Sequence, residues 1–426
     1  MNRLTAAKPS WITVLAFAAG FFLTAELGRV VSLKGTSYVS FWLPAGLYMG
    51  ILLVHHPRYW PIFIQAVLPV NLLFDLRHGT PLATTLGFYL ANTTEAVIGA
   101  WLTRRFMAGQ PRLQSLQDLY GLIAGSAVIS TVAGAMVGAV TMKWSAMAPS
   151  FGRAFVMWWC SEAMAIILVA PFLLVWWPAP GKALGHFFGR RRLIEVILLA
   201  GIMVVATGAM LKGNQDTFYT YKTCVLPLLL WAGLRFGLAG ATVANLWLAF
   251  LIGGFAYYAV PGYPGGGLTM AGMFLQIQCF MLVAAVVSLV PAIFMEDRER
   301  QLAALAASRE TMSKAFNNSP LAVVITDHQT GRILESNDKF AGFFDLAAER
   351  LVGATALELA IWAEPAQRDK YLEALQKQGA IQDWEIVCHN AKGVRLELSV
   401  NAVLVAIGGR RCIISTFQEI TRRKQI

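Results

Sequence analysis

The chain has 426 residues, of which 57% are hydrophobic, and a formal net charge of +11. This composition excludes a single soluble globular domain, because so apolar a chain would expose large hydrophobic patches to water. Residues 1–295 hold 18 Lys and Arg against 7 Asp and Glu, whereas residues 296–426 hold 17 of each kind. We therefore predict a membrane-embedded part over 1–295 and a neutral soluble part that begins near Glu296.

Ten stretches of residues 1–295 reach or approach the roughly 20 apolar residues that a helix needs to cross a bilayer. Helices are expected because these stretches lack the alternation of barrel strands. We predict an α-helical polytopic membrane bundle of about eight to ten spans, with ten preferred. The ten stretches are 11–27, 38–55, 60–76, 82–102, 118–142, 153–177, 193–211, 218–234, 236–259 and 269–294.

The positive charges indicate the orientation of this bundle. With the N-terminus inside and ten spans, eleven Lys and Arg of residues 1–295 fall on the inner side and seven on the outer side. An even number of spans also returns the soluble part to the cytoplasm. Topology and attraction to anionic lipid explain the basic excess, so we expect the lipid bilayer and no nucleic acid as a partner.

Several polar residues lie within the predicted spans. Glu95 and Glu162 are near the middles of their stretches, and Asn92 is one helical turn from Glu95. Asn71 and Asp75 form a similar pair four residues apart. Ionisable groups in lipid are costly and usually face the bundle interior. They are therefore candidates either for a sensing site or for hydrogen bonds that hold helices together.

Five short motifs follow one another across residues 10–295. In this order they resemble the signatures of the bacterial membrane-associated sensor domain of the first type (MASE), although that family usually has Asp where this chain has Glu162. The resemblance implies a multi-pass sensor in the bacterial cytoplasmic (inner) membrane that feeds diguanylate cyclases, phosphodiesterases or histidine kinases. It implies an unknown small-molecule signal. The motifs are Phe41-Trp42-Leu43-Pro44-Ala45-Gly46, Arg58-Tyr59-Trp60-Pro61, Ala91-Asn92-Thr93-Thr94-Glu95-Ala96, Trp158-Trp159-Cys160-Ser161-Glu162-Ala163, and Leu226-Pro227 with Trp231-Ala232 and Leu234-Arg235-Phe236-Gly237.

Four motif residues join the polar residues as candidates for ligand binding. Pro44 interrupts a helix start and leaves backbone groups that a ligand or a neighbour must satisfy. Trp42 and Trp158 either border a ligand or anchor the bundle at the membrane interface. Arg235 lies near the end of its stretch, where it either contributes to ligand binding or lies at the membrane–water interface. For Trp60 we favour the interfacial anchor.

Residues 296–316 read as a helix that leaves the membrane. Leu302, Leu305, Met312 and Phe316 recur at near-heptad spacing, with Arg309 at a core-like position between them. This pattern indicates a short parallel coiled coil that joins two copies of the chain. An amphipathic helix that packs on its own domain gives the same pattern.

Residues 317–426 form a small α+β domain by their pattern. Strands are expected at 321–326, 332–335, 384–388, 394–405 and 411–418, with helices between the second and third. This order resembles a PAS domain, whose markers match Asn337 and the closing Glu419-Ile420-Thr421, where the family usually has Asp-Ile-Thr. The resemblance implies that Asn337, Glu419 and Thr421 relay strain from the sheet into a following helix.

Signatures of catalysis and of cofactors are lacking in the sequence. We find no nucleotide-binding or cyclising loop, no metal cluster, no photochemical Asn-Cys-Arg run and no haem His in the helix expected at 365–377. We predict no cofactor and no metal, and leave the PAS ligand unassigned. Trp362 and Trp384 could border a cavity, but we favour core packing.

These features predict a sensory input module with no catalysis of its own. A signal would pass from the membrane domain through the linker and the PAS domain to an output domain beyond residue 426, with cyclic-di-GMP synthesis or degradation as the expected output. The alternatives are the input of a histidine kinase and a transporter with a regulatory PAS tail. The expected partners are a second copy of the chain and a membrane protein.

Overall fold

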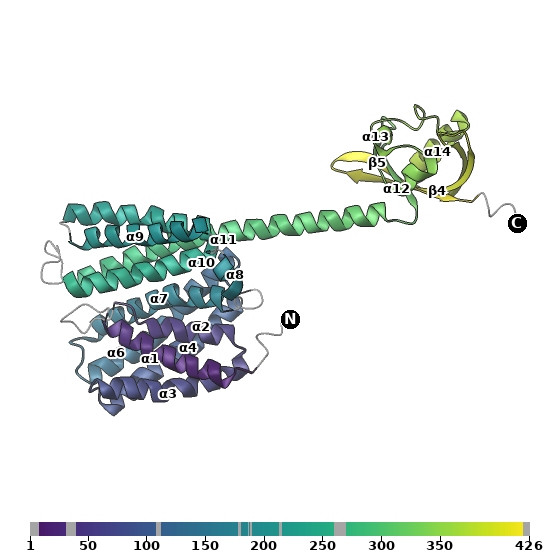
Figure 1. Ribbon diagram of the computed structural model, residues 1–426. Helices are drawn as coiled ribbons and strands as arrows, with labels where there is room; N and C mark the ends of the chain where they lie inside the picture. The colour runs from purple at the N-terminus through teal and green to yellow at the C-terminus, as the bar shows by residue number, and fades with distance from the viewer. Residues whose placement is uncertain are drawn as a thin grey trace. The chain divides into compact units, whose positions relative to one another are not determined.

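The computed structural model describes residues 8–30, 40–107, 112–177, 180–185, 187, 190–212, 215–259 and 270–420. The chain divides into two compact units, Met1–Arg300 and Gln301–Ile426 (Figure 1). The first unit is all-helical and the second is built around a β-sheet. The predicted fold class, a helical membrane bundle followed by a small α+β domain, is confirmed.

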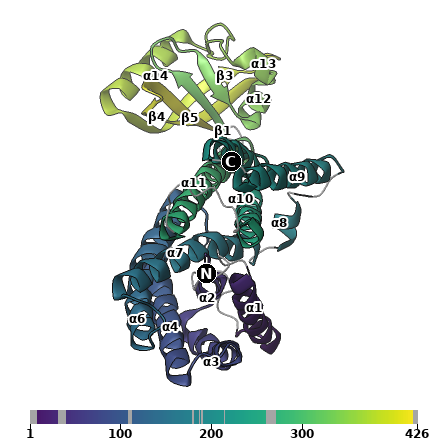
Figure 2. The ribbon, with the colours of Figure 1, turned by 90° about the vertical axis from the view of Figure 1, so that its left-hand side faces the viewer.

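The first unit is a bundle of helices that lie side by side (Figures 1 and 2). The helices α5, η3 and α6 follow one another without a break, and the middle one is a π-helix. The helix α11 begins in the first unit and ends in the second. The elements are α1 (Trp11–Val30), α2 (Leu43–Val54), η2 (Pro57–Tyr59), α3 (Trp60–Arg77), α4 (Leu82–Phe106), α5 (Leu116–Gly121), η3 (Leu122–Ser130), α6 (Thr131–Trp144), α7 (Phe151–Trp176), α8 (Pro180–Gly185), α9 (Arg190–Lys212), α10 (Gln215–Ala259) and α11 (Met270–Asn317).

Seven of the described helical segments are long and apolar enough to cross a bilayer. Each of the ten predicted stretches coincides with a helix. Three features explain why only seven described segments, rather than ten, meet the length and hydropathy of a span. The helix α2 has only 12 residues, and α4 is rich in polar residues such as Asn92 and Glu95. The stretches 218–234 and 236–259 both lie within α10. Ten spans therefore stays a prediction.

The helix α10 reverses its direction at Gly237. This residue has φ 64° and ψ −158°, a conformation that only glycine adopts without strain. Arg235 pairs with Glu195 of α9, and Trp247 donates to the carbonyl of Ala200, only five residues further along α9. A straight helix would separate Arg235 and Trp247 by about 18 Å. Both halves of α10 therefore pack against α9 in opposite directions.

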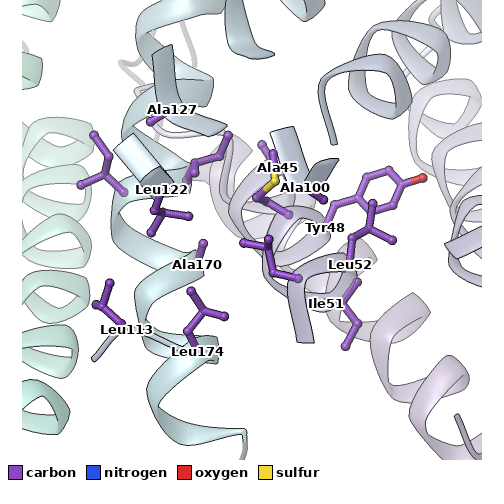
Figure 3. Close-up of a cluster of buried hydrophobic side chains, with 14 of the residues drawn as sticks. Ala45, Tyr48, Ile51, Leu52, Ala100, Leu113, Leu122, Ala127, Ala170 and Leu174 are labelled. Atoms are coloured by element: carbon purple, nitrogen blue, oxygen red, sulfur yellow. The ribbon is translucent and has the colours of Figure 1, made fainter. Parts of the chain in front are cut away.

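The helix α2 lies at the centre of the bundle. Tyr48 and Leu52 are buried among side chains of neighbouring helices such as Leu122 and Leu174 (Figure 3). A Cβ atom added to Gly46 would lie 2.2 Å from the carbonyl oxygen of Ala165, so α2 and α7 approach as closely as backbones allow. Small residues at such contacts are typical of helix packing in membranes.

Three polar or aromatic residues of the spans have structural roles. Asn245 donates to Ser288 at 2.8 Å, and Gln278 donates to the carbonyl of Ser40 at 2.5 Å. The interfacial role predicted for Trp60 is wrong. Its side chain is 8% exposed and donates to the carbonyl of Leu52, because the η2 turn directs the indole into the bundle.

The second unit contains one antiparallel sheet with the strand order β2-β1-β5-β4-β3. The helices α12, α13 and α14 contribute to the same apolar core as the strands, and Figure 2 shows them along the sheet. The elements are β1 (Ala322–Asp327), β2 (Ile333–Ser336), α12 (Asp338–Phe344), α13 (Ala348–Leu351), α14 (Pro365–Gln378), β3 (Ala380–His389), β4 (Arg395–Ile407) and β5 (Arg410–Glu419).

All five predicted strands are present, with one shifted boundary. The strand β3 begins at Ala380 rather than at residue 384. Its pairing with β4 is irregular between Ile381 and Trp384, where Asp383 has φ 48°. Such a bulge interrupts the alternation of apolar and polar side chains on which the prediction depended.

Candidate functional site

A cavity of about 250 Å³ lies at one end of the membrane unit. Its walls come from the ends of α1, α3 and α6, the start of α2, and the first halves of α4 and α7, as far as Asn92 and Glu162 near the middles of these two helices. The lining residues are Arg29, Trp42, Asn71, Phe74, Asp75, His78, Thr80, Phe88, Asn92, Met142, Met147, Met157, Trp158, Ser161 and Glu162.

Six of the nine predicted ligand-binding residues line this cavity. They are Trp42, Asn71, Asp75, Asn92, Trp158 and Glu162. Glu95 is buried and does not line the cavity; its side chain lies against Gly134 of α6. The fold thus brings together residues from four separate helices that the sequence had only grouped by type.

The other two predicted residues lie elsewhere. Pro44 is buried in the first turn of α2 and shapes the helix start next to Trp42. Arg235 forms a two-bonded ion pair with Glu195 of α9, at 2.7 and 3.0 Å, and does not line the cavity. Arg235, which belongs to the fifth family motif, thus joins α9 to α10 beside the reversal at Gly237.

Two glycines of α6 make room for the acidic and aromatic residues of the site. A Cβ atom on Gly134 would lie 2.5 Å from Glu95 Oε2. A Cβ atom on Gly138 would lie 2.5 Å from the ring of Trp158. Since real Cβ atoms are not found so close to other atoms, any side chain at these positions would displace Glu95 or Trp158.

Hydrogen bonds fix parts of the cavity wall. Asn71 donates to Asp75 Oδ2 at 2.7 Å, so the pair predicted from its spacing is formed within α3. The backbone N–H of Trp42 donates to Ser161 Oγ at 3.0 Å and ties the start of α2 to α7. Two aromatic pairs also line the cavity. The rings of Trp42 and Phe74 lie 5.7 Å apart, and those of Phe88 and Trp158 lie 5.4 Å apart.

Several buried polar atoms of the site have no hydrogen-bond partner among the described residues. They are Asn92 Oδ1, Glu95 Oε2, Trp158 Nε1 and Glu162 Oε2. The side chains of Glu95 and Glu162 are only 2% and 3% exposed. An unpaired buried carboxyl group costs several kcal/mol, and natural proteins seldom keep one without a function.

The sequence had not indicated some residues of the cavity. Ser161 precedes Glu162 in the same motif, so a motif-wide reading would have included it. The ring of Phe88 lies 5.4 Å from that of Trp158, tilted by 45°, but Phe88 lies one helical turn before Asn92. The four-residue spacing of Gly134 and Gly138 is a sequence pattern typical of a close helix approach.

A second cavity, of about 270 Å³, lies within the PAS unit. Tyr371 lines it and shares a 2.9 Å hydrogen bond with Ser415. Burial raises the pKa of Tyr371 and raises that of the Cys388 thiol to about 12. Cys388 is therefore a protonated thiol and a poor nucleophile. Trp362 both lines this cavity and packs 5.6 Å from Tyr371.

Asn337 connects three elements of the PAS unit. Its Oδ1 accepts from the backbone N–H of Val323 in β1 and of Phe340 in α12, at 2.8 and 2.9 Å. Its Nδ2 donates to the carbonyls of Leu321 and of Phe316, the latter in the last turn of α11. With a 1% exposed side chain, Asn337 holds the end of α11 against the sheet.

The other two predicted relay residues lie at the end of the chain. Glu419 is exposed at the last position of β5, opposite Leu398. Thr421 lies outside the described residues.

Residues 13–299 match the sequence profile of a known family, MASE1. The chain belongs to the MASE1 family. The profile covers all helices of the membrane unit up to the part of α11 that follows the last span. Residues 316–425 match the PAS fold, as the sheet and the resemblance predicted. The cavity therefore lies within the MASE1 domain, and the Asn337 contacts lie within the PAS domain.

The comparisons also identify similar individual proteins. Probable diguanylate cyclase DgcE of Escherichia coli (strain K12) is 22% identical over 339 residues, which are 79% of this chain and 29% of that protein. The chain thus spans less than a third of that relative. The PAS domain of an HTR-like protein from Haloarcula marismortui is 16% identical (TM-score 0.26; 29% of this chain, 99% of that chain). That of nitrogen regulation protein NR(II) from Vibrio parahaemolyticus is 21% identical (TM-score 0.22; 25% and 96%).

Proposed function

We propose that this chain is the sensory input of a longer signalling protein whose output is the synthesis of cyclic di-GMP. The MASE1 cavity receives the signal, and α11 and the PAS domain carry it to a diguanylate cyclase domain of the same polypeptide. The observation that carries the proposal is the cavity itself. Family motif residues from separate helices converge on it and leave buried polar atoms without partners.

The proposed orientation directs the cavity away from the cytoplasm. Its walls include the ends of α1, α3 and α6, the start of α2, and the first halves of α4 and α7. With the N-terminus and the PAS domain in the cytoplasm, these ends lie on the outer side of the inner membrane. The cavity is then open to solutes outside the cell, which suits a receptor.

Contacts at the exit of α11 support a mechanical relay. Glu296 accepts a hydrogen bond from the backbone N–H of Leu238, directly after the reversal at Gly237, at 3.1 Å. Arg300 donates to the carbonyl of Gln114 and to Glu296. A shift of α10 or of the α5 start would therefore act on the position of α11. The Asn337 contacts at the other end of α11 would pass that movement to the sheet.

The exposed face of α11 supports a homodimer. Leu302, Leu305 and Met312 are 56%, 67% and 72% exposed, although they have the spacing of a coiled-coil seam. The alternative, a helix that packs on its own domain, would bury them. We infer that a second copy of the chain covers this face.

The similarity of this chain to 29% of probable diguanylate cyclase DgcE supports cyclic di-GMP as the output. The test uses the product of the native gene, purified in nanodiscs, whose intact mass and conversion of GTP are measured. A mass well above 46.6 kDa together with cyclic-di-GMP formation is expected. Autophosphorylation on histidine instead of cyclic-di-GMP formation would show that the output is a histidine kinase. Uptake of solutes by proteoliposomes would favour a transporter.

A further inference from the structure

We propose that the MASE1 cavity binds a small organic cation with one primary ammonium group. The inference rests on the proposed sensing function for its biological meaning, but its chemistry comes from the cavity alone. The volume of about 250 Å³ lies just below the usual range of roughly 300–1,000 Å³ for ligand pockets, so the ligand is small.

The polar atoms that lack partners call for a hydrogen-bond donor. Within the described part of the chain, three of those at the site are acceptors, Asn92 Oδ1, Glu95 Oε2 and Glu162 Oε2, and one is a donor, Trp158 Nε1. Asn92 and Glu162 line the cavity and are 6% and 3% exposed. A primary ammonium group offers three N–H donors and the charge that a buried carboxylate requires.

Among the described residues that line the cavity, no cation supplies this charge to the buried wall. Arg29 lines the cavity but is exposed at the end of α1. His78 lies with Nε2 3.7 Å from Glu26 and Nδ1 2.8 Å from the carbonyl of Phe74. Asp75 already accepts a hydrogen bond from Asn71. Glu162 Oε2 has no such donor among the described residues, so we expect Glu162 to be the carboxyl group that pairs with the ligand.

The remaining lining suits an alkylammonium rather than a bare metal ion. The rings of Trp42, Phe74, Phe88 and Trp158 surround the cavity, and aromatic faces attract desolvated cations. Methionine side chains, which adapt to irregular apolar groups, cover another part of the wall. Among the described residues, no three His, Cys, Asp or Glu side chains come together as a metal ion would need.

The test measures binding to the full chain in nanodiscs by isothermal titration calorimetry. The probes are n-butylammonium, tetramethylammonium and butyrate, with sodium chloride as the blank. We expect n-butylammonium to bind, tetramethylammonium to bind more weakly because it has no N–H donor, and butyrate not to bind. Absence of n-butylammonium binding, or equal binding of butyrate, would overturn the proposal.

Variants assign the binding to the cavity. Glu162→Gln should weaken n-butylammonium binding by about thirtyfold or more, since it removes the buried charge that pairs with the ligand. Asn92→Ala is a second cavity variant and should weaken binding by about fivefold, as the loss of one hydrogen bond does. Glu195→Gln, a carboxylate of α9 outside the cavity, is the matched control and should bind as the wild type does. Unchanged affinity in both Glu162→Gln and Asn92→Ala, with thermal unfolding like that of the wild type, would exclude this site.

The same probes separate this inference from the proposed function. If n-butylammonium binds through Glu162 but leaves the cyclic-di-GMP synthesis of the native protein unchanged, the ligand class holds and the sensing function fails. If no ammonium compound binds, while Glu162→Gln still alters the response of cyclic-di-GMP synthesis to growth conditions, the sensing function holds and the ligand class fails.

Discussion

Gly138→Ala tests whether the close approach of α6 to Trp158 shapes the MASE1 cavity. The added Cβ would lie 2.5 Å from the ring, whose position is also limited by Phe88 at 5.4 Å. Overpacking of this kind costs typically about 1–3 kcal/mol. A glycine replaced by alanine within a helix otherwise gains about 0.5–1 kcal/mol. The matched control is Gly201→Ala in α9, where an added Cβ meets nothing within 4 Å.

The two alanine variants share the helix gain, so their difference isolates the clash. We expect Gly138→Ala to be less stable than Gly201→Ala by about 1–3 kcal/mol in SDS-induced unfolding from mixed micelles. Trp158→Leu in the Gly138→Ala background should recover part of the loss, since the two sites are in contact. Equal stability of the two alanine variants would refute the packing described for α6 and α7.

Three further predictions concern the relay and the reversal. Asn337→Ala should destabilise the PAS domain by about 2–4 kcal/mol in urea unfolding, because it leaves buried backbone groups unpaired and removes a helix cap. Gly237→Ala should cost about 1–3 kcal/mol in SDS unfolding, because its φ of 64° and ψ of −158° strain any other residue. The raised pKa of Cys388 predicts that the stability of the PAS domain is full below pH 9 and declines as the pH rises toward 12, since unfolding releases the thiol to its ordinary pKa near 9.0.

Each of these predictions has a control. Asn337→Ser keeps a side-chain oxygen that can cap α12 and should lose less stability than Asn337→Ala; an equal loss would contradict the role of the Oδ1 bonds. Gly201→Ala again controls for the helix gain at Gly237, and a Gly237→Ala chain as stable as that control would contradict the reversal. Cys388→Val should flatten the alkaline decline, and an unchanged decline would assign it to other groups.

Six of the candidate residues line one cavity because their motifs lie in adjoining parts of neighbouring helices. Pro44 marks the start of α2 beside Trp42, whereas Asn92 and Trp158 lie two to three turns into α4 and α7. Arg235 shared the signal of an ionisable residue near a span, but its partner Glu195 is 40 residues away in sequence. A long-range ion pair has no local pattern, so the sequence could not assign Arg235 to α9 rather than to the cavity.

The fold was predictable where the side-chain period was regular. The alternation of apolar and polar side chains predicted the strands of the PAS sheet. It did not predict the first residues of β3, where a bulge near Asp383 interrupts the alternation. The lengths of the apolar stretches predicted the membrane helices. They could not indicate that α10 reverses its direction at Gly237 or that α2 has only 12 residues. Trp60 was misjudged because the η2 turn, which aims it inward, has no signature beyond a proline.

The most direct test of the central claim follows the output of the native protein in cells grown across a set of media. Cyclic-di-GMP levels are compared for the wild type, Glu162→Gln and the control Glu195→Gln, with equal amounts of protein in the membrane. The account predicts that the level varies with the medium in the wild type and in Glu195→Gln, and is fixed in Glu162→Gln. A Glu162→Gln protein whose output follows the medium as the wild type does would contradict a sensing role of the MASE1 cavity.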